Sequence, residues 1–226
     1  ESPEHPSIQK PQILLTALTH AREPAGMQQL IYLMWYLLEN YDTNPEIKFL
    51  VDHLDFYFVP CVNPDGYTFN TSGYPNGGGM WRKNRRNNGN NTWGVDLNRN
   101  YGYQWGYDDI GSSVNGNDET YRGSAAFSEM ETQQIKLLCE THQFSLAINN
   151  HCYGNMLIYP WGHIPEVTPD SMLFRAYAKE LTAVNHFVYG TCYEVLNYNA
   201  NGGSSDWFYG EQTTKNKIIE FSPEAG

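Results

Sequence analysis

The stretch Thr19-His20-Ala21-Arg22-Glu23-Pro24 follows the apolar run Ile13-Leu14-Leu15-Thr16-Ala17-Leu18 and precedes a long amphipathic segment. The apolar run predicts a buried strand over residues 12–19, and the amphipathic segment predicts a helix over residues 26–41. His20 and Glu23 would then lie at the end of a strand, where α/β sheets place their sites. Because the residue before a proline is pushed out of the α region, Glu23 is expected on a loop. An imidazole and a carboxylate at this spacing can bind one metal ion, although alone they also fit a solvated polar pair.

The composition restricts the class of protein. With 226 residues, of which 40% are hydrophobic, the chain can form one domain with a full core. The net charge of −11 argues against nucleic acid or an anionic membrane as the main partner. No apolar run is long enough to span a bilayer, and no signal peptide is visible. The four cysteines form no C-x-x-C pair, which makes a cysteine zinc site unexpected and leaves one disulfide open.

Predicted strands and helices alternate along the chain. Strands are predicted over residues 54–61, 144–149, 156–159, 192–196 and 217–221. Helices are predicted over residues 45–53, 128–142, 168–184 and, in a short piece, 204–209, the second starting from a capping box. Between residues 67 and 127 the periodicity disappears, and a stretch of this length is expected to be functional. The alternation predicts an α/β fold in a single domain over residues 1–226.

Polar residues follow several of the predicted strands. Besides His20 and Glu23, these are Asn63-Pro64-Asp65-Gly66, His151 and Glu220. Two histidines and one carboxylate leave a tetrahedral zinc ion with one open position for water, which is typical of a catalytic site. A further carboxylate must take the proton of that water, and Glu220 is the candidate. The alternative for Glu220 is a structural ion pair.

The motifs together carry a resemblance to a known family. In chain order they are His20-x-x-Glu23, Asn63-Pro64-Asp65-Gly66, Trp81-Arg82-Lys83, Asp96-Leu97-Asn98-Arg99-Asn100, His151, Tyr198, Gly202-Gly203-Ser204-Ser205-Asp206-Trp207 and Glu220. This set resembles the zinc metallocarboxypeptidases of the pancreatic carboxypeptidase A/B type, and residues 98–106 look closest to the bacterial carboxypeptidase T branch. The resemblance implies a mixed, mostly parallel central sheet with helices on both faces. Relative to the family, the chain is expected to lack the N-terminal strands and the C-terminal helix.

The resemblance also implies the catalytic residues. His20, Glu23 and His151 would bind one zinc ion. Glu220 would act as the general base and then protonate the leaving amine. Arg82 would polarise the scissile carbonyl and stabilise the developing oxyanion, for which a fixed cation is suited. The implied activity is zinc-dependent hydrolysis of the C-terminal peptide bond.

Further residues are implied in substrate binding. Asn98 and Arg99 would hold the terminal carboxylate, and a planar guanidinium is a good donor for that group. Tyr198 would close over the substrate from a mobile loop, and Arg22 would contact the penultimate residues. Asp96 would accept a hydrogen bond from His20, which orients a metal ligand.

The pocket for the last side chain is predicted to be neutral. By the resemblance, Ser205 lies near its floor. The other matching positions are Ile158, Gly162, Ala200, Gly203 and Ile218. An unpaired lysine charge would be costly among them, whereas an apolar side chain would gain by leaving water. The sequence therefore predicts a preference for apolar or aromatic C-terminal residues.

Alternatives remain beside this interpretation. A zinc amidase on the same scaffold, acting on acylated amino acids or peptidoglycan stem peptides, would share the three metal ligands but would not need Asn98, Arg99 and Tyr198. A non-catalytic binding module is the other alternative. The Asp- and Asn-rich residues 108–119 could bind calcium, as bacterial relatives of the family do, although a solvated acidic loop is favoured. The resemblance further implies a secreted monomer whose partners are peptide or protein C-termini.

Overall fold

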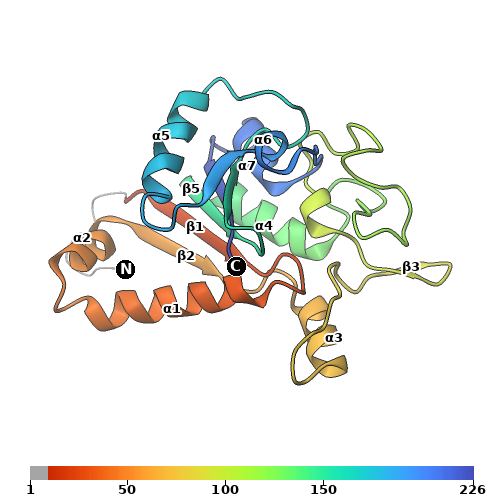
Figure 1. The fold of residues 1–226 in the computed structure, drawn as a ribbon, viewed down its shortest axis with the longest axis horizontal. Coiled ribbons are helices and arrows are strands. Elements are labelled where there is room, and N and C mark those ends of the chain that lie inside the picture. The colour runs from red at the N-terminus through yellow and green to blue at the C-terminus, as the bar shows by residue number, and fades with distance from the viewer. Residues whose placement is uncertain (1–9) are drawn as a thin grey trace.

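The computed structural model describes residues 10–226, and its centre is a six-stranded sheet. Along the sheet the strands are β2 (Asp55–Val59), β1 (Gln12–Ala17), β5 (Phe144–Asn150), β8 (Ile219–Glu224), β6 (Met156–Tyr159) and β7 (Val188–Thr191). The first four are parallel to one another, and β6 and β7 run in the opposite direction. The predicted mixed, mostly parallel sheet is therefore confirmed (Figure 1).

Helices cover both faces of the sheet. On one face, α1 (Pro24–Asn40) packs on β1 through Leu30 and Leu15, and α5 (Ser171–Leu181) packs on β8 through Phe174 and Phe221. The other face carries α4 (Met130–Thr141) and α7 (Ser204–Gly210), whose side chains form a core cluster with Leu14. Side chains alternate between the faces of a strand, so the neighbours Leu14 and Leu15 serve the two cores.

Two helices differ from the sequence prediction because of their first residues. α3 (Pro64–Gly73) begins where only a turn was predicted; the side chain of Asn63 accepts the amide of Gly66, and proline is favourable at a first helical position. α6 (Cys192–Leu196) replaces a predicted strand. Here Thr191 and Glu194 form a capping box, which ends β7 and starts the helix.

Other predicted elements are present with shifted ends. α2 (Pro45–His53) is capped by Asn44, as its sequence suggests. α4 starts without the predicted capping box. The hydroxyl of Ser128 donates to the carboxylate of Glu129, and no side chain at the start of the helix accepts a helix amide. β8 continues three residues further than predicted, to Glu224, and this extension decides the arrangement of the site described below.

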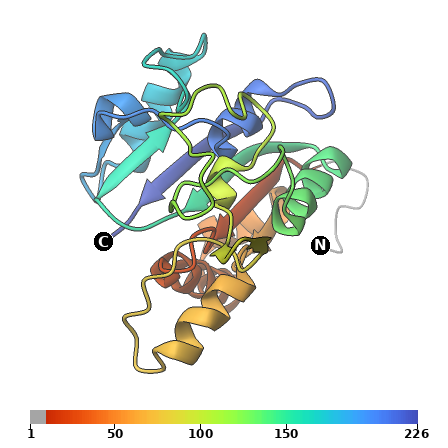
Figure 2. The ribbon, with the colours of Figure 1, turned by 90° about the vertical axis from the view of Figure 1, so that its right-hand side faces the viewer.

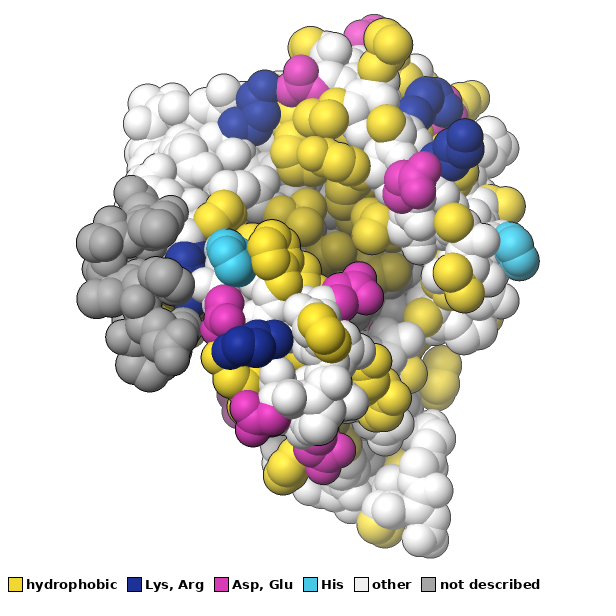
Figure 3. All heavy atoms as spheres, turned by 90° about the vertical axis from the view of Figure 1, so that its left-hand side faces the viewer, with side chains coloured by type: hydrophobic (Ala, Val, Ile, Leu, Met, Phe, Trp, Pro, Cys, Tyr) yellow, Lys and Arg dark blue, Asp and Glu magenta, His cyan; other side chains and the backbone are white. Residues whose placement is uncertain are grey.

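The long irregular stretch before α4 lies across the carboxyl ends of the parallel strands (Figure 2). It contains the short strands β3 (Asn87–Gly89) and β4 (Thr92–Trp93) and the 3-10 helix η1 (Leu97–Arg99). On the opposite side, where β1 and β2 begin, hydrophobic side chains line a hollow in the surface (Figure 3). All four cysteines are free thiols, so the disulfide left open by the sequence is not formed. Within residues 10–226, no helix is long and apolar enough to cross a membrane.

Candidate active site

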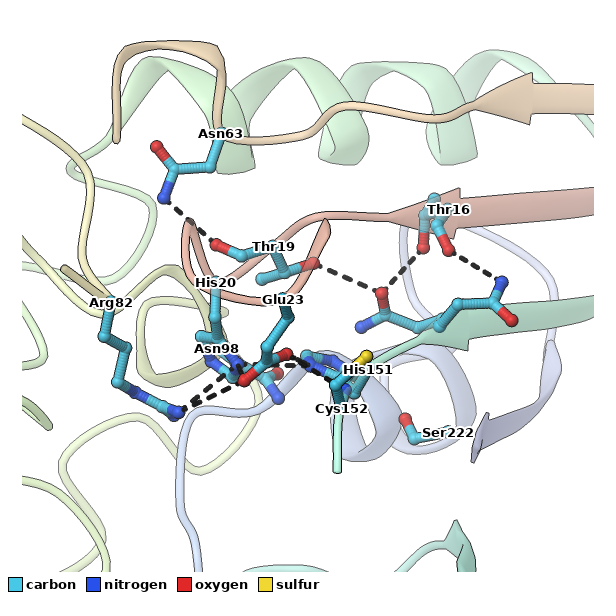
Figure 4. Close-up of polar contacts among 12 residues, drawn as sticks. Thr16, Thr19, His20, Glu23, Asn63, Arg82, Asn98, His151, Cys152 and Ser222 are labelled. Atoms are coloured by element: carbon cyan, nitrogen blue, oxygen red, sulfur yellow. Dashed lines mark hydrogen bonds and ion pairs between the residues drawn. The ribbon is translucent and has the colours of Figure 1, made fainter. Parts of the chain in front are cut away.

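Three side chains converge at the carboxyl ends of β1 and β5. Nδ1 of His20 lies 2.9 Å from one carboxylate oxygen of Glu23, and Nδ1 of His151 lies 2.9 Å from the other. The two Nδ1 atoms are 3.1 Å apart (Figure 4). Two nitrogens on a tetrahedral zinc ion would be about 3.3 Å apart, given Zn–N bonds of about 2.05 Å. The donor set and its spacing therefore fit zinc, and all three residues are buried.

The loop that carries His20 and Glu23 is held by neighbouring amide side chains. The Asn63 amide donates to the Thr19 carbonyl at 3.2 Å, and the Thr19 hydroxyl donates to Asn149 at 3.2 Å (Figure 4). Glu23 is the residue immediately before α1, outside the helix, as its position before proline predicted. The burial of Glu23 would raise its pKa, but the adjacent His20 and His151 hold it below the usual value. The carboxylate is therefore ready to bind a cation.

Asp96 lies on the other side of the candidate metal ligands, where it contacts His20 and Arg82. Its Oδ1 lies 3.3 Å from Nε2 of His20, and its Oδ2 accepts from Nε and Nη2 of Arg82 at 3.1 and 2.9 Å. The complete burial of Asp96 would raise its pKa, but the charges of Arg82 and Arg99 hold it well below its usual range. Asp96 is thus a buried anion that orients His20 and fixes the guanidinium of Arg82. Nη1 of Arg82 remains 3.3 Å from Nδ1 of His20, beside the metal ligands.

A cavity of about 500 Å³ opens beside these groups. Nine of the ten site residues predicted from the sequence line it. They are His20, Arg22, Glu23, Arg82, Asn98, Arg99, His151, Tyr198 and Ser205. The cavity therefore brings the three metal ligands together with the residues expected to bind substrate, and only Glu220 is not part of its lining.

Arg99 and Asn98 are fixed by bonds that leave some of their donors for the cavity. Nε of Arg99 donates to the carbonyl of Gly111 at 2.9 Å, and Nη1 donates to the carbonyl of Asn98 at 2.8 Å. Oδ1 of Asn98 accepts from the amide and the hydroxyl of Ser204, at 2.9 and 3.1 Å. Among the described residues this leaves Nη2 of Arg99 and the amide nitrogen of Asn98 for a ligand.

The outer part of the cavity is built from more exposed residues. Arg22 pairs with Glu119 at 3.0 Å near the cavity mouth. Tyr198 is 49% exposed and lies two residues after the end of α6. Gly202, after Tyr198, has φ of +68°, and a Cβ there would lie 2.5 Å from the Arg99 carbonyl oxygen. This glycine therefore serves a close approach between two chain segments as well as a turn.

Glu220 lies away from the metal ligands. It is completely buried and pairs with Ala147 in the sheet, four residues before His151. With a rise of about 3.3 Å per residue, this places its Cα roughly 13 Å along the strand from the level of His151. The structure thus does not bring Glu220 to the metal site, contrary to the role that the sequence analysis gave it.

Glu224 occupies the expected place of that carboxylate. It lines the cavity and forms a β-bridge with His151. The amide of His151 donates to the carbonyl of Pro223 at 2.9 Å, which extends β8 to this point. Burial raises the pKa of Glu224 to about 7. The signal in the sequence was the alternation of Glu220, Ser222 and Glu224, which share one face of a strand.

The acidic side chains of the loop that was proposed to bind calcium form hydrogen bonds and ion pairs with nearby residues. Oδ1 of Asp108 accepts the amides of Ile110 and Gly111, and Asp118 accepts from the hydroxyl of Ser113. Asp109 pairs with an arginine at 2.8 Å. In the part of the chain that the structure describes, these acids do not come together as a metal-binding group.

The chain is similar in sequence to known zinc carboxypeptidases. The zinc carboxypeptidase family model matches residues 2–226. Zinc carboxypeptidase A 1 of Anopheles gambiae is 33% identical over 216 residues, which are 91% of this chain and 47% of that protein. Metallocarboxypeptidase A of Trichophyton tonsurans is 35% identical over 211 residues, or 88% of this chain and 48% of that protein. The chain thus spans about half the length of these curated relatives.

A solved structure has a similar fold. The crystal structure of carboxypeptidase A from Helicoverpa armigera superposes with a TM-score of 0.82 at 28% identity. The match covers 95% of this chain and 52% of that one. The similarity in fold therefore extends over nearly the whole of this chain.

Proposed function

Because the chain belongs to the zinc carboxypeptidase family, we propose that it carries the site that hydrolyses the C-terminal peptide bond of peptides and proteins, with zinc as cofactor. The observation that supports this most is the convergence of His20, Glu23 and His151 at a cavity that also contains Arg99 and Glu224. A metal-binding triad, a carboxylate and a fixed guanidinium are the groups that an exopeptidase of this type requires.

The metal ligands and Arg82 would act on the scissile carbonyl. A zinc ion held by His20, Glu23 and His151 would supply a Lewis acid and a water of lowered pKa. Arg82 is held in place by two bonds to Asp96, so its guanidinium need not reorganise as negative charge develops on the carbonyl oxygen. Its Nη1, beside the metal ligands, is the atom available for that oxygen.

Glu224 is proposed as the general base, in place of Glu220. A proton acceptor must lie within reach of the attacking water, and Glu224 lines the cavity beside His151. Its pKa of about 7 is suited to accepting a proton and then giving it to the leaving amine. Glu220 is less suited to this role, because it lies outside the cavity lining and pairs with Ala147, four residues before His151.

Arg99 and Asn98 are proposed to bind the terminal carboxylate. The free Nη2 of Arg99 and the amide nitrogen of Asn98 can donate to its two oxygens. Tyr198 and Arg22, at the more exposed end of the cavity, would contact the preceding part of the peptide. The secreted location and the monomeric state implied by the resemblance stay predictions.

The test is an assay of the zinc-loaded chain on blocked dipeptides and on the same dipeptides amidated at the C-terminus. We expect hydrolysis of the free acids, loss of hydrolysis with a zinc chelator and recovery on adding zinc. The amides should be hydrolysed far more slowly, because Arg99 would lack its anionic partner. Equal rates on acids and amides would instead indicate an amidase or endopeptidase.

A further inference from the structure

The inner end of the cavity differs from the sequence prediction at one position. Ser205 and the small neutral residues expected there do line the cavity, but Ile218 does not. Ile218 is completely buried in the core cluster with Leu14 and Phe208. β8 instead presents Ser222 to the cavity. The predicted apolar preference therefore loses one of the residues on which it depended, and a hydroxyl takes its place.

A buried carboxyl lies directly behind the two serines. The Ser222 hydroxyl donates to Oε1 of Glu220 at 2.7 Å, and the Ser205 and Ser222 hydroxyl oxygens are 3.3 Å apart. Oε2 of Glu220 is buried and has no hydrogen-bond partner among the described residues. An unpartnered buried carboxyl oxygen is costly, so its position behind a cavity suggests that a ligand compensates for it.

Among the described residues, no lysine, arginine or histidine forms an ion pair with Glu220. The ion pairs of residues 10–226 do not include it, and the charged group nearest to it on α7 is another acid, Asp206. Asp206 accepts the amides of Gly162 and His163, so its own carboxylate is already held. The inner end of the cavity thus has acceptors and hydroxyls but no positive charge.

We propose that Glu220, acting through Ser205 and Ser222, is the specificity residue of the cavity and selects peptides that end in lysine or arginine. The proposal rests on the function proposed above. Glu224, Ser222 and Glu220 form a row on one face of β8, roughly 7 Å apart at each step. A substrate whose scissile bond lies at Glu224 would extend its last side chain along this row, toward the serines.

The chemistry of the row favours a cationic side chain. The hydroxyls of Ser205 and Ser222 can accept from an ammonium or guanidinium group while Ser222 donates to Glu220. A positive charge at the serines would also stabilise the ionised form of Glu220, which burial disfavours. A phenyl or leucyl group would instead cover two hydroxyls and leave the carboxyl unpaired. A site built from polar acceptors discriminates against apolar side chains for this reason.

The experiment compares native protein with Glu220→Gln on zinc-loaded samples. Matched blocked dipeptides ending in Lys, Arg, Phe and Leu are the substrates, and kcat/KM is measured for each. We expect the native protein to favour Lys or Arg over Phe, and Glu220→Gln to lower the Lys-to-Phe ratio at least tenfold. Glu180→Gln, on the exposed side of α5, is the matched control and should keep the native ratio. A native preference for Phe or Leu that Glu220→Gln does not alter would overturn the proposal.

A binding measurement separates this proposal from the proposed function. If the native protein hydrolysed none of the dipeptides, the proposed activity would fail, while the cavity could still be tested. Calorimetric titration with free L-lysine and L-phenylalanine then decides. Tighter binding of lysine in the native protein, reduced at least tenfold in Glu220→Gln, would support the role of Glu220. Equal affinities of the native protein and the variant for lysine would reject it.

Discussion

His151 and Glu224 are bridge partners on neighbouring segments of the sheet, so backbone pairing places a candidate metal ligand beside a carboxylate. The amide of His151 donates to the carbonyl of Pro223 at 2.9 Å, and the amide of Ala225 donates back to the carbonyl of His151 at 3.1 Å. These two bonds involve the residues on either side of Glu224 and fix its distance from His151. The geometry of the proposed active site therefore depends on the end of β8, beyond the point at which the sequence predicted that the strand stops.

The first prediction concerns Glu224. Glu224→Gln should keep zinc and substrate affinity but reduce kcat by at least about a thousandfold, because the amide cannot accept the proton of the attacking water. Steady-state kinetics and elemental analysis measure the two effects. Glu180→Gln is the control for a lost carboxylate at the surface. A Glu224→Gln protein with most of its kcat would show that another group is the base.

The second prediction concerns recognition of the terminal carboxylate. Arg99→Lys should raise KM for free-acid substrates about tenfold or more with a smaller change in kcat, since an ammonium replaces a fixed planar donor. The same substitution should hardly change the slow hydrolysis of amidated substrates. Because Arg99 also bonds the carbonyl of Gly111, thermal denaturation should be measured in parallel. A similar fold-change on acids and amides would contradict the assigned contact.

The third prediction concerns the loop after Tyr198. Gly202→Ala should lower the free energy of unfolding by about 2 kcal/mol or more, because φ is +68° and the added Cβ would meet the Arg99 carbonyl oxygen. Gly73→Ala is the matched control, since nothing lies within 4 Å of a Cβ at that position and its φ is not positive. Denaturant unfolding of both variants gives the comparison. Equal stabilities would show that the loop relaxes around the new side chain.

The fourth prediction concerns pH. Burial raises the pKa of Glu220 to about 8, above the ordinary value of 4.5 that applies in the unfolded chain. The folded state therefore holds this proton more strongly, and the contribution of Glu220 to stability is greatest below pH 4.5 and is lost as the pH rises to about 8. The loss should be at most about 5 kcal/mol. Glu220→Gln should remove this part of the decline, as measured by denaturant unfolding at pH 5 and pH 8.5. Parallel pH profiles of the two proteins would mean that Glu220 is ionised in the fold.

The sequence predicted that the three candidate metal ligands lie together because local patterns determine their positions. His20 and Glu23 follow a continuous apolar strand, and His151 follows another, so the carboxyl ends of two parallel strands had to bring them together. The α/β class was likewise predictable from the alternating segments, and the mixed sheet from the resemblance. The end of β8 could not be predicted from the sequence. Pro223 lacks an amide donor and is typical of strand ends, whereas here its carbonyl accepts from His151.

The other differences have the same origin in capping and pairing. The strand-like residues 192–196 form α6 because Thr191 and Glu194 cap each other, which outweighs the β propensity of the segment. The structure moves Ile218 from the pocket to the core because it lies outside β8, in contact with Phe208. The hydrophobicity of Ile218 alone could not show whether it lies in the pocket or in the core, because an isoleucine suits both places.

The pairing of β1 with β5 has a consequence for how the metal is acquired. Nδ1 of His20 and Nδ1 of His151 are separated by 131 positions in sequence, so an unfolded chain would lose much conformational entropy in bringing them to one ion. The sheet register removes this cost before any ion arrives, because Ala17 already pairs with Asn150. The unfolded chain retains only the local pair of His20 and Glu23. Zinc should therefore act as a cross-link of the finished sheet, binding after the strands have paired and slowing their separation.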